Sequence, residues 1–239
     1  MRLSPLGKRE WLTTLLIAAV LIGLFIWLKI WWAIAIVAVI AFCLCAFFRD
    51  PERNIPVRRN IMVAPADGVI SSIHEVENFE LFGGEGATCV RIFLSVLDVH
   101  INRSPCHGIV GPITGKQGKY LNALNPESAE VNTWSMFPLL HPTKKHPVAA
   151  VRQVSGMIAR TIVCTAKEGD ILQRGERFGL IKFGSTTELY VPRSFQPKVL
   201  VQKGQRVWGG ETEMIEVMPP GESNAVKTVE QEEPAEAAV

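Results

Sequence analysis

The hydrophobic pattern begins with an almost uninterrupted apolar run from Trp11 to Phe48. Four of its 38 residues fall outside the hydrophobic class, namely Thr13, Thr14, Gly23 and Lys29. A single helix of this length would extend about 57 Å, well beyond the roughly 30 Å of a bilayer's hydrocarbon core. Lys29 divides the run into Trp11–Leu28 and Ile30–Phe48, each close to the minimum length of a membrane span. The run therefore predicts two short membrane helices.

Charges around this run predict its orientation. Basic residues flank both outer ends, and they are Arg2, Lys8, Arg9, Arg49, Arg53, Arg58 and Arg59. Because Lys29 and a tryptophan cluster mark the opposite interface, the positive-inside rule favours a helical hairpin or re-entrant anchor with both ends in the cytoplasm. One steep span followed by an interfacial helix is the alternative, and it would place the soluble part outside. A cleaved signal peptide fits poorly, since the run is too long and no A-x-A-like site follows it.

Beyond the anchor, the pattern changes to short apolar stretches separated by glycine and proline. Stretches of this kind, rich in valine, isoleucine and aromatic residues, are typical of β-strands. The expected strands are Val69–Val76, Thr88–Val96, Gln153–Thr165, Phe178–Phe183, Thr187–Val191 and Lys198–Val201. Asn122–Lys145 contains three prolines and is expected to form a long surface loop, with helical periodicity only over Ser128–Met136. We therefore expect a mainly β domain.

This pattern divides the chain into four parts. They are a membrane anchor of two short hydrophobic helices (1–48), a basic juxtamembrane linker (49–60), a β-rich domain (61–218) and a disordered acidic tail (219–239). Within the β-rich domain a G-x5-G-E pattern occurs twice, beginning at Gly169 and at Gly204. Glycine-rich hairpins of this kind resemble the turns of barrel-sandwich, lipoyl-like β domains, a likeness that predicts a fold but no chemistry.

Composition and charge narrow the class of protein. Of the 239 residues, 48% are hydrophobic and 20% are charged, which excludes a disordered chain and a transporter with many spans. The tail holds five Glu and one Lys, a net charge of −4, so the remaining chain carries +6 of the total of +2. A basic domain of this kind suits a surface of anionic lipid. No metal-site spacing is present, and no nucleic-acid partner is expected.

The dipeptide Gly184-Ser185, between two expected strands, is the first candidate for chemistry. In isolation, a glycine before a serine is most often a turn or a bulge. The functional interpretation depends on the missing Cβ, which lets Gly184 adopt strained backbone angles and lets the Ser185 hydroxyl reach the Gly184 carbonyl. Attack there would give an ester, elimination would leave a dehydroalanine, and hydrolysis would leave an N-terminal pyruvoyl group.

Two further candidates lie near the ends of apolar stretches. Strand alternation places Asp98, His100 and Asn102 on one face. A histidine beside a carboxylate at a strand end is suited to acid–base chemistry near neutral pH, and an exposed histidine in a turn is the competing interpretation. Asp67 precedes Gly68, and this pair more often only marks a turn.

Five short motifs occur in a fixed order along the chain. They are Phe47–Arg53 (FFRDPER), Pro65–Gly68 (PADG), Phe93–Pro105 (FLSVLDVHINRSP), Val154–Arg160 (VSGMIAR) and Gly175–Ser185 (GERFGLIKFGS). Together they resemble the short, archaeal-type form of the phosphatidylserine decarboxylase proenzymes. The resemblance extends from Phe47 to about Glu216, and each motif makes a chance match of the others less credible.

The resemblance implies that the chain cleaves itself between Gly184 and Ser185. The products would be a β chain (1–184) and an α chain (185–239) that stay associated, and the α chain would begin with a covalent pyruvoyl group made from Ser185. This cofactor would act as an electron sink when phosphatidylserine in the membrane is decarboxylated to phosphatidylethanolamine. The enzyme would sit in the cell membrane with its soluble domain on the cytoplasmic side. Dimers are common in the family, but the sequence does not fix the oligomeric state.

The resemblance also implies roles for individual residues. Asp67 matches the family's relay aspartate for self-cleavage. His100 matches the histidine associated with decarboxylation, and we expect it to deliver a proton with Asp98 or Asn102 orienting it. The candidates for contact with the substrate are Asp98, Asn102 and Arg103, with Arg91 and Lys119 as further cations.

Three positions depart from the family's pattern. Longer members have a second histidine where this chain has Arg103, so a full Asp-His-Ser relay does not carry over. Thr186 replaces the arginine that commonly follows the serine, and Asn132–Trp134 (NTW) replaces the usual Asn-Glu-Arg element. These departures leave the base for self-cleavage and the substrate contacts open.

A different class of function is the alternative. A membrane hairpin joined to a lipoyl-like β domain would also suit a non-enzymatic adaptor of a membrane-protein complex. This hypothesis explains the repeated G-x5-G-E pattern. It gives no reason for the context of Gly184-Ser185 or for the segment around His100.

Overall fold

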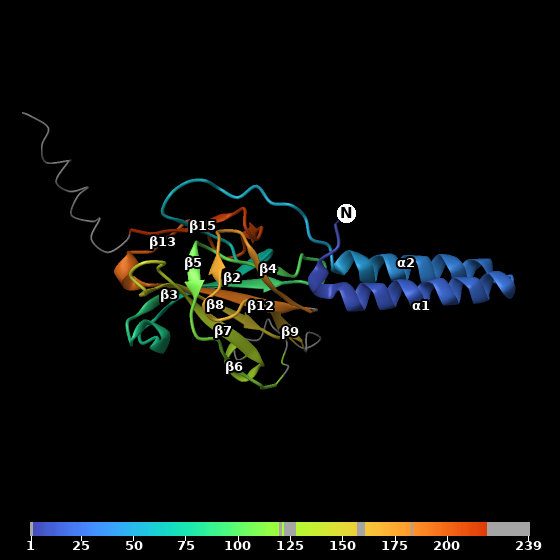
Figure 1. The fold of residues 1–239 in the computed structure, drawn as a ribbon, viewed down its shortest axis with the longest axis horizontal. Coiled ribbons are helices and arrows are strands. Elements are labelled where there is room, and N and C mark those ends of the chain that lie inside the picture. The colour runs from blue at the N-terminus through green and yellow to red at the C-terminus, as the bar shows by residue number, and fades with distance from the viewer. Residues whose placement is uncertain (1, 120, 122–127, 157–160, 183, 219–239) are drawn as a thin grey trace, which may run out of the picture.

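The computed structural model describes residues 2–119, 121, 128–156, 161–182 and 184–218. It consists of a helical hairpin and a β domain. Figure 1 shows the hairpin projecting from one end of the β domain, with the N-terminus at the junction. The acidic tail expected over residues 219–239 lies outside the described residues.

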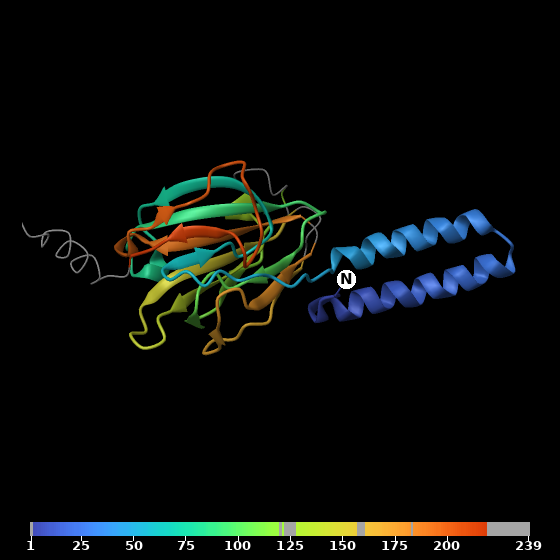
Figure 2. The same ribbon diagram turned by 90° about the horizontal axis from the view of Figure 1, so that it is seen from above.

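The hairpin contains the two expected helices. A 3-10 turn, η1 (Pro5–Gly7), leads into α1 (Lys8–Trp27), and α2 (Trp31–Phe47) returns beside it, as both views show (Figures 1 and 2). The segment Pro5–Trp27 is long and apolar enough to cross a membrane, whereas α2 is shorter. Lys29, with φ 60°, lies in the turn between the helices, where the sequence predicts the break. Small side chains are buried along the hairpin, which allows close approach of two helices, and they are Ala18, Ala33 and Ala41.

The β domain is built on a nine-stranded sheet in which every described pair is antiparallel. Its order is β10 (Ile171–Leu172), β5 (Gly108–Val110), β7 (Trp134–Leu140), β8 (Pro147–Val154), β12 (Ser185–Pro192), β3 (Ala87–Leu94), β2 (Gly68–Val76) and β14 (Arg206–Val207), with β6 (Thr114–Lys116) paired to β7. Strand β12 lies between β3 and β8, and all eight of its residues are buried. The segment that begins at Ser185 therefore forms the middle of the sheet.

Two three-stranded sheets complete the domain. One has the order β1 (Ile61–Val63), β15 (Glu213–Glu216) and β13 (Lys198–Val199), and the other has the order β4 (Ile101–Arg103), β11 (Arg177–Ile181) and β9 (Ile162–Cys164). The short helical elements are η2 (Glu80–Phe82), α3 (Ser128–Val131) and η3 (Arg193–Phe195). The prediction of a mainly β domain is confirmed. The more specific barrel-sandwich expectation is not, since the described strands form no closed barrel and the main sheet ends at β10 and β14.

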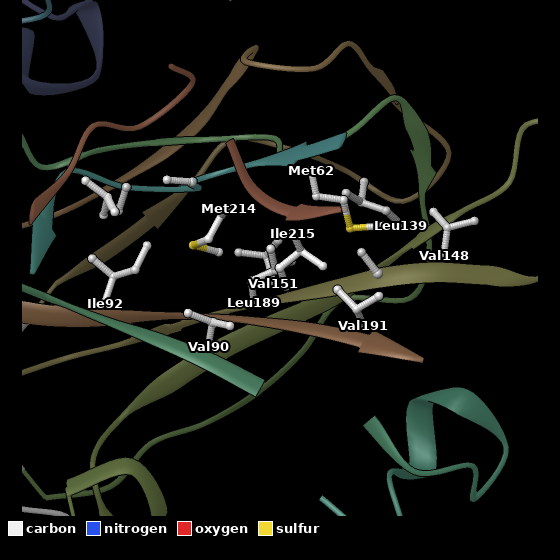
Figure 3. Packing of buried hydrophobic residues seen from close by; sticks show 14 of the residues in the cluster. Met62, Val90, Ile92, Leu139, Val148, Val151, Leu189, Val191, Met214 and Ile215 are labelled. Carbon is white, nitrogen blue, oxygen red and sulfur yellow. The ribbon is translucent and has the colours of Figure 1, made fainter. Parts of the chain in front are cut away.

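The main core lies between the large sheet and the sheet of β1 and β15. Figure 3 shows Met62, Met214 and Ile215 facing valine, leucine and isoleucine side chains of the large sheet. The residues labelled there from β3, β8 and β12 are Val90, Ile92, Val148, Val151, Leu189 and Val191. Strand alternation places Ser185 and Thr187 on the same face of β12 as Leu189 and Val191. The hydroxyl of Ser185 thus continues the core-facing row.

The two G-x5-G-E segments form equivalent structures at opposite ends of the large sheet. Gly169 precedes β10 and Gly204 precedes β14, both with φ near +90°. Gly169 N–H donates to Val110 O and Gly204 N–H donates to Ile70 O, each at 2.8 Å. Because a positive φ is costly for residues with a Cβ, this turn explains why glycine recurs there. The two copies of the G-x5-G-E pattern therefore have the same local backbone geometry.

Two expected segments are wrong. Gln153–Thr165 is not one strand: β8 ends at Val154, β9 begins at Ile162 in a different sheet, and residues 157–160 lie outside the described residues. Much of the loop expected over Asn122–Lys145 is strand β7, and helix is described there only as α3. Pro138 misled the prediction. It is tolerated because β6 pairs with residues 134–136 and β5 with 139–140, so the proline falls between the two partner strands.

The linker after α2 is fixed to the β domain by buried ion pairs. Asp50, 1% exposed, accepts from Arg103 Nη2 at 3.0 Å and pairs with Arg177 Nε at 2.7 Å. Arg53 donates through Nη2 to Asp67 Oδ2 at 2.6 Å. Asp50 and Arg53 are the linker residues in these pairs, so both an acidic and a basic residue of the linker hold it to the β domain.

The hairpin is also docked directly on the β domain. Phe47 and Phe48 pack with Val99, Ile101 and Leu180 in a small apolar cluster. A Cβ on Gly7 would lie 2.1 Å from the Phe48 ring, so only glycine fits that contact. The N-terminus, the end of α2 and strands β4 and β11 therefore form one packed unit.

We predict that the Asp50 carboxylate is essential for the stability of the fold. Asp50→Asn removes the negative charge between two guanidinium groups in a buried site, so we expect the free energy of unfolding to fall by about 3 kcal/mol. Glu52→Gln is the matched control, because Glu52 is exposed and its nearest cation, Arg2, is 3.8 Å away. Urea unfolding of the detergent-solubilised protein measures both, and equal stability of the two variants would contradict the role of Asp50.

Candidate active site

The Gly184-Ser185 bond lies at the start of β12, just after the segment that follows β11. Ser185 begins β12 opposite Leu94 of β3 and is fully buried. Within the described residues its Oγ has no hydrogen-bond partner. Gly184 has φ +67°, in the left-handed region that favours glycine. A buried, uncommitted hydroxyl therefore follows a backbone position that needs glycine.

His100 contacts Gly184, the residue that precedes this bond. Gly184 N–H donates to His100 Nε2 at 3.2 Å, and His100 Nδ1 lies 2.9 Å from Asp98 O. Because the first contact uses Nε2 as an acceptor, the proton of the neutral ring is on Nδ1, where it bonds the Asp98 carbonyl. The imidazole is fully buried and packs against the Phe47 ring, with 4.4 Å between centroids. One histidine is thus held at the junction of the membrane anchor and the serine.

The environment of His100 keeps the ring neutral. Burial lowers its pKa from 6.5 to about 4, and the positive charge of Arg49 adds to this effect. The backbone hydrogen bond and the negative charge of Asp98 act in the opposite direction but do not outweigh burial. At neutral pH the imidazole is therefore a proton acceptor with a fixed tautomer.

Asn102 ties His100's strand to β12. Its Nδ2 donates to Thr187 Oγ1 at 2.9 Å, and its Oδ1 accepts from Gln153 Nε2 at 2.7 Å. The expected alternation therefore holds for His100 and Asn102, which both reach the start of β12. Asn102 has both polar ends occupied by the protein, so its role here is to position strands.

Asp98 orients His100 through its backbone instead of its carboxylate. Asp98 Oδ2 accepts from the N–H and hydroxyl of Ser95 at 2.8 and 2.7 Å, and Oδ1 accepts from Arg206 at 2.7 Å. Burial acts to raise the pKa of this carboxyl, but these hydrogen bonds hold it below its usual value. The side chain closes a tight turn, and the carbonyl sets the histidine tautomer.

Asp67 lies in a separate polar cluster. Its Oδ2 accepts from Arg53, and its Oδ1 accepts from Gly209 N–H at 2.8 Å. Burial raises the pKa of the carboxyl, and Arg53 opposes that shift. Among the described residues no contact is found between its side chain and His100 or Ser185.

The expected substrate cations are mostly engaged by the protein. Arg103 bonds Asp50, Pro51 O and Gly175 O, and although burial lowers its pKa to about 10 it stays charged at neutral pH. Arg91 pairs with Glu188 at 3.4 Å and donates to Thr186 Oγ1, next to Ser185, at 3.4 Å. The backbone of Lys119 bridges to Asn132. Arg103 and Arg91 therefore have protein partners, and the contact with Thr186 brings Arg91 to the residue beside Ser185.

Phe47 and Arg49 were missed as site residues. Both belong to the FFRDPER motif, which carries the family resemblance but gives no reason to place it beside His100. The available signal was an aromatic pair at the end of the second apolar run, followed at once by a cation. Only the fold shows that this point packs on the histidine.

Comparison with known proteins gives one family. Residues 40–214 match the family model of phosphatidylserine decarboxylase. A phosphatidylserine decarboxylase proenzyme from Granulibacter bethesdensis is 42% identical over 85% of this chain and 81% of its own length. Proenzymes of the same name are 38% identical in Zymomonas mobilis, over 88% and 85%, and 41% identical in Symbiobacterium thermophilum, over 89% and 95%. These matches confirm the resemblance to the family but do not test the short, archaeal-type form, and the chain belongs to the phosphatidylserine decarboxylase family.

Proposed function

We propose that this chain is a proenzyme that cleaves itself between Gly184 and Ser185 and then decarboxylates phosphatidylserine to phosphatidylethanolamine. The observation that carries the proposal is the contact of His100 Nε2 with Gly184 N–H beside the buried, unpartnered hydroxyl of Ser185. The family membership of the chain supports the same reaction. The adaptor alternative gives no reason for this arrangement.

Self-cleavage uses only groups of this chain. Ser185 Oγ attacks the Gly184 carbonyl carbon, the C–N bond breaks, and the hydroxyl proton ends on the Ser185 nitrogen, which leaves an ester. Loss of the Ser185 α-proton then releases the Gly184 carboxylate and forms a dehydroalanine. Addition of water and loss of ammonia give the pyruvoyl terminus. In this proposal neutral His100 accepts and returns the protons of these steps, and its contact with Gly184 N–H supports that role.

The residues present fit a pyruvoyl group at position 185. The site is buried, it begins a strand held on both sides, and Gly184 supplies the conformational freedom that cleavage needs. The pyruvoyl carbonyl would supply an electron sink for the carbanion left by loss of CO2. His100 would deliver the proton to that carbon, with the Asp98 carbonyl holding the ring in place.

Asp67 takes the part of a positioning residue in this proposal. It holds Arg53 of the linker and the Gly209 N–H, and it immediately precedes β2. Gly68 packs against Phe93 O in β3, the strand that flanks β12. For the relay role implied by the resemblance, the Asp67 carboxylate would have to reach Ser185 through contacts other than these.

The apolar hairpin supports a site at a membrane surface. With both helices in a bilayer, Arg2, Lys8, Arg9 and Arg49 lie at one end of the hairpin, which the positive-inside rule assigns to the cytoplasm. The β domain is joined to the same end (Figure 1). Since β12 is central in the large sheet, the α chain (185–239) would remain bound to the β chain (1–184) after cleavage.

Replacing Ser185 tests the cleavage directly. Ser185→Ala removes the attacking oxygen, so we expect one chain of 26.4 kDa where the wild type gives two. Intact-mass measurement distinguishes the two outcomes, and the smaller wild-type chain should resist Edman degradation. Ser194→Ala, an exposed serine elsewhere, is the control and should cleave normally. Wild-type protein that decarboxylates the lipid as a single chain would contradict the proposal.

The neutral state of His100 predicts a pH dependence of stability. Its pKa is about 4 in the folded protein and 6.5 when unperturbed, so between these values the unfolded chain binds the extra proton. The unfolding free energy therefore decreases as the pH falls from about 6.5 to about 4. Urea unfolding of the uncleaved Ser185→Ala protein should show this decrease, and adding His100→Gln should reduce it. An identical pH dependence with and without His100 would argue against a buried neutral ring.

A further inference from the structure

An apolar groove of about 260 Å³ lies where the end of α2 meets the turn after β3. Its lining residues are Phe42, Cys43, Leu44, Ala46, Phe47, Arg49, Val96 and Leu97. This volume is below the roughly 300–1,000 Å³ of sites that enclose a whole drug-sized ligand. The groove therefore fits a segment of a longer molecule.

The turn on one side of the groove is rigid and carries apolar side chains. Asp98 N–H donates to Ser95 O at 3.0 Å, and the Asp98 carboxylate bonds Ser95 in return. The tip of such a turn is usually polar or glycine. Here Val96 and Leu97 occupy it, and Leu97 is 84% exposed. Exposed apolar residues on a fixed turn indicate contact with an apolar partner.

The other wall of the groove identifies that partner as lipid. Phe42 and Leu44 are exposed on α2, and they continue the apolar surface of the hairpin. Under the proposed function this surface lies in the bilayer, so the groove opens toward the hydrocarbon region. An acyl chain can enter it without crossing water.

Arg49 gives the groove a charged end. Its guanidinium donates to Ala46 O at 3.1 Å and to Leu97 O, and among the described residues no carboxylate pairs with it. A cation bonded only to carbonyls at the end of an apolar channel complements a phosphodiester. Its positive charge also helps to lower the pKa of His100, to which burial contributes most.

Phe47 connects the groove to the reacting bond. The ring lines the groove and stacks on His100, whose Nε2 contacts Gly184 N–H. From the groove to the reacting bond, the protein presents an apolar wall, a cation, an aromatic ring, a histidine and a serine. A phospholipid presents its acyl chain, its phosphate and its amino-acid headgroup in the same order. The acyl chain therefore matches the apolar wall, the phosphate matches the cation, and the headgroup matches the histidine and serine.

We propose that this groove holds the segment of a substrate acyl chain nearest the glycerol, and that Arg49 faces the phosphodiester. The headgroup then lies beyond Phe47, toward His100 and Ser185. The proposal rests on the proposed function and adds the position of the lipid in the same site.

Kinetics with two substrates test the acyl contact. The first is long-chain phosphatidylserine in mixed micelles, and the second is glycerophosphoserine, which has the same headgroup and no acyl chains. The double variant Val96→Ser with Leu97→Ser should raise KM for the long-chain lipid about tenfold, equivalent to roughly 1.4 kcal/mol, and leave kcat/KM for glycerophosphoserine unchanged. Ile171→Ser, an exposed apolar residue on β10, is the matched control and should change neither value.

Two further variants distinguish the contact with the phosphodiester from the contact with the acyl chain. Arg49→Gln should raise KM for both substrates, because both carry the phosphodiester. Ala46→Phe, which fills the groove from the helix side, should affect only the long-chain lipid. Intact mass should show two chains for each variant, which confirms that the site has formed.

Equal loss on both substrates in the Val96→Ser/Leu97→Ser variant or in Ala46→Phe, or no loss on either substrate in these two variants, would overturn the proposal. A diazirine placed near the carbonyl end of the acyl chain offers a second measurement that needs no variant. The label should map to Phe42–Arg49 or to Val96 and Leu97, and labelling confined to α1 would overturn the proposal. Wild-type protein inactive on both substrates would instead contradict the proposed function, so the two failures are distinguishable.

Discussion

The Asp50 carboxylate, buried between Arg103 and Arg177, is the interaction on which the arrangement of the site depends. Arg103 ends β4 and Arg177 begins β11, so one carboxylate from the linker joins these paired strands at one end. At the other end of the same pair, His100 precedes β4 and Gly184 follows β11, and the two residues are in contact. The ion pairs therefore fix the strands that bring the histidine to Gly184. They also fix the point at which the hairpin leaves the domain.

Much of this could be predicted from the sequence because the signals are local. Residues that are neighbours in the sequence determine the apolar run with its break at Lys29. They also determine the alternation of His100 and Asn102. Gly184 was also recognisable, since a glycine before a serine has a local conformational reason. The mainly β character followed from the same short-range pattern. Motif order, matched over most of the chain, then supplied the family.

The remaining features depend on partners far apart in the chain, and local patterns do not encode them. Pro138 indicated a loop, but the change of partner strand from β6 to β5 leaves room for it inside a sheet. Arg103 looked like a substrate cation because its partner, Asp50, lies 53 residues away in a segment read as a membrane-surface linker. The sequence assigned Phe47 to the membrane anchor, but its ring also packs against the His100 imidazole. Each error has the same origin, a contact between segments that are distant in sequence.

The hydrogen bond from Gly184 N–H to His100 Nε2 has a consequence for the order of the chemistry. Under the proposed function, cutting after Gly184 turns that residue into a chain terminus, and its new carboxylate starts out beside the imidazole. A negative charge at this distance favours the protonated ring, which opposes the effect of burial. The uncut chain would then hold a neutral histidine, and the cut chain would hold one that takes up a proton more readily and so has a proton to donate. The proposed cleavage would thereby change the protonation of the same side chain between maturation and turnover.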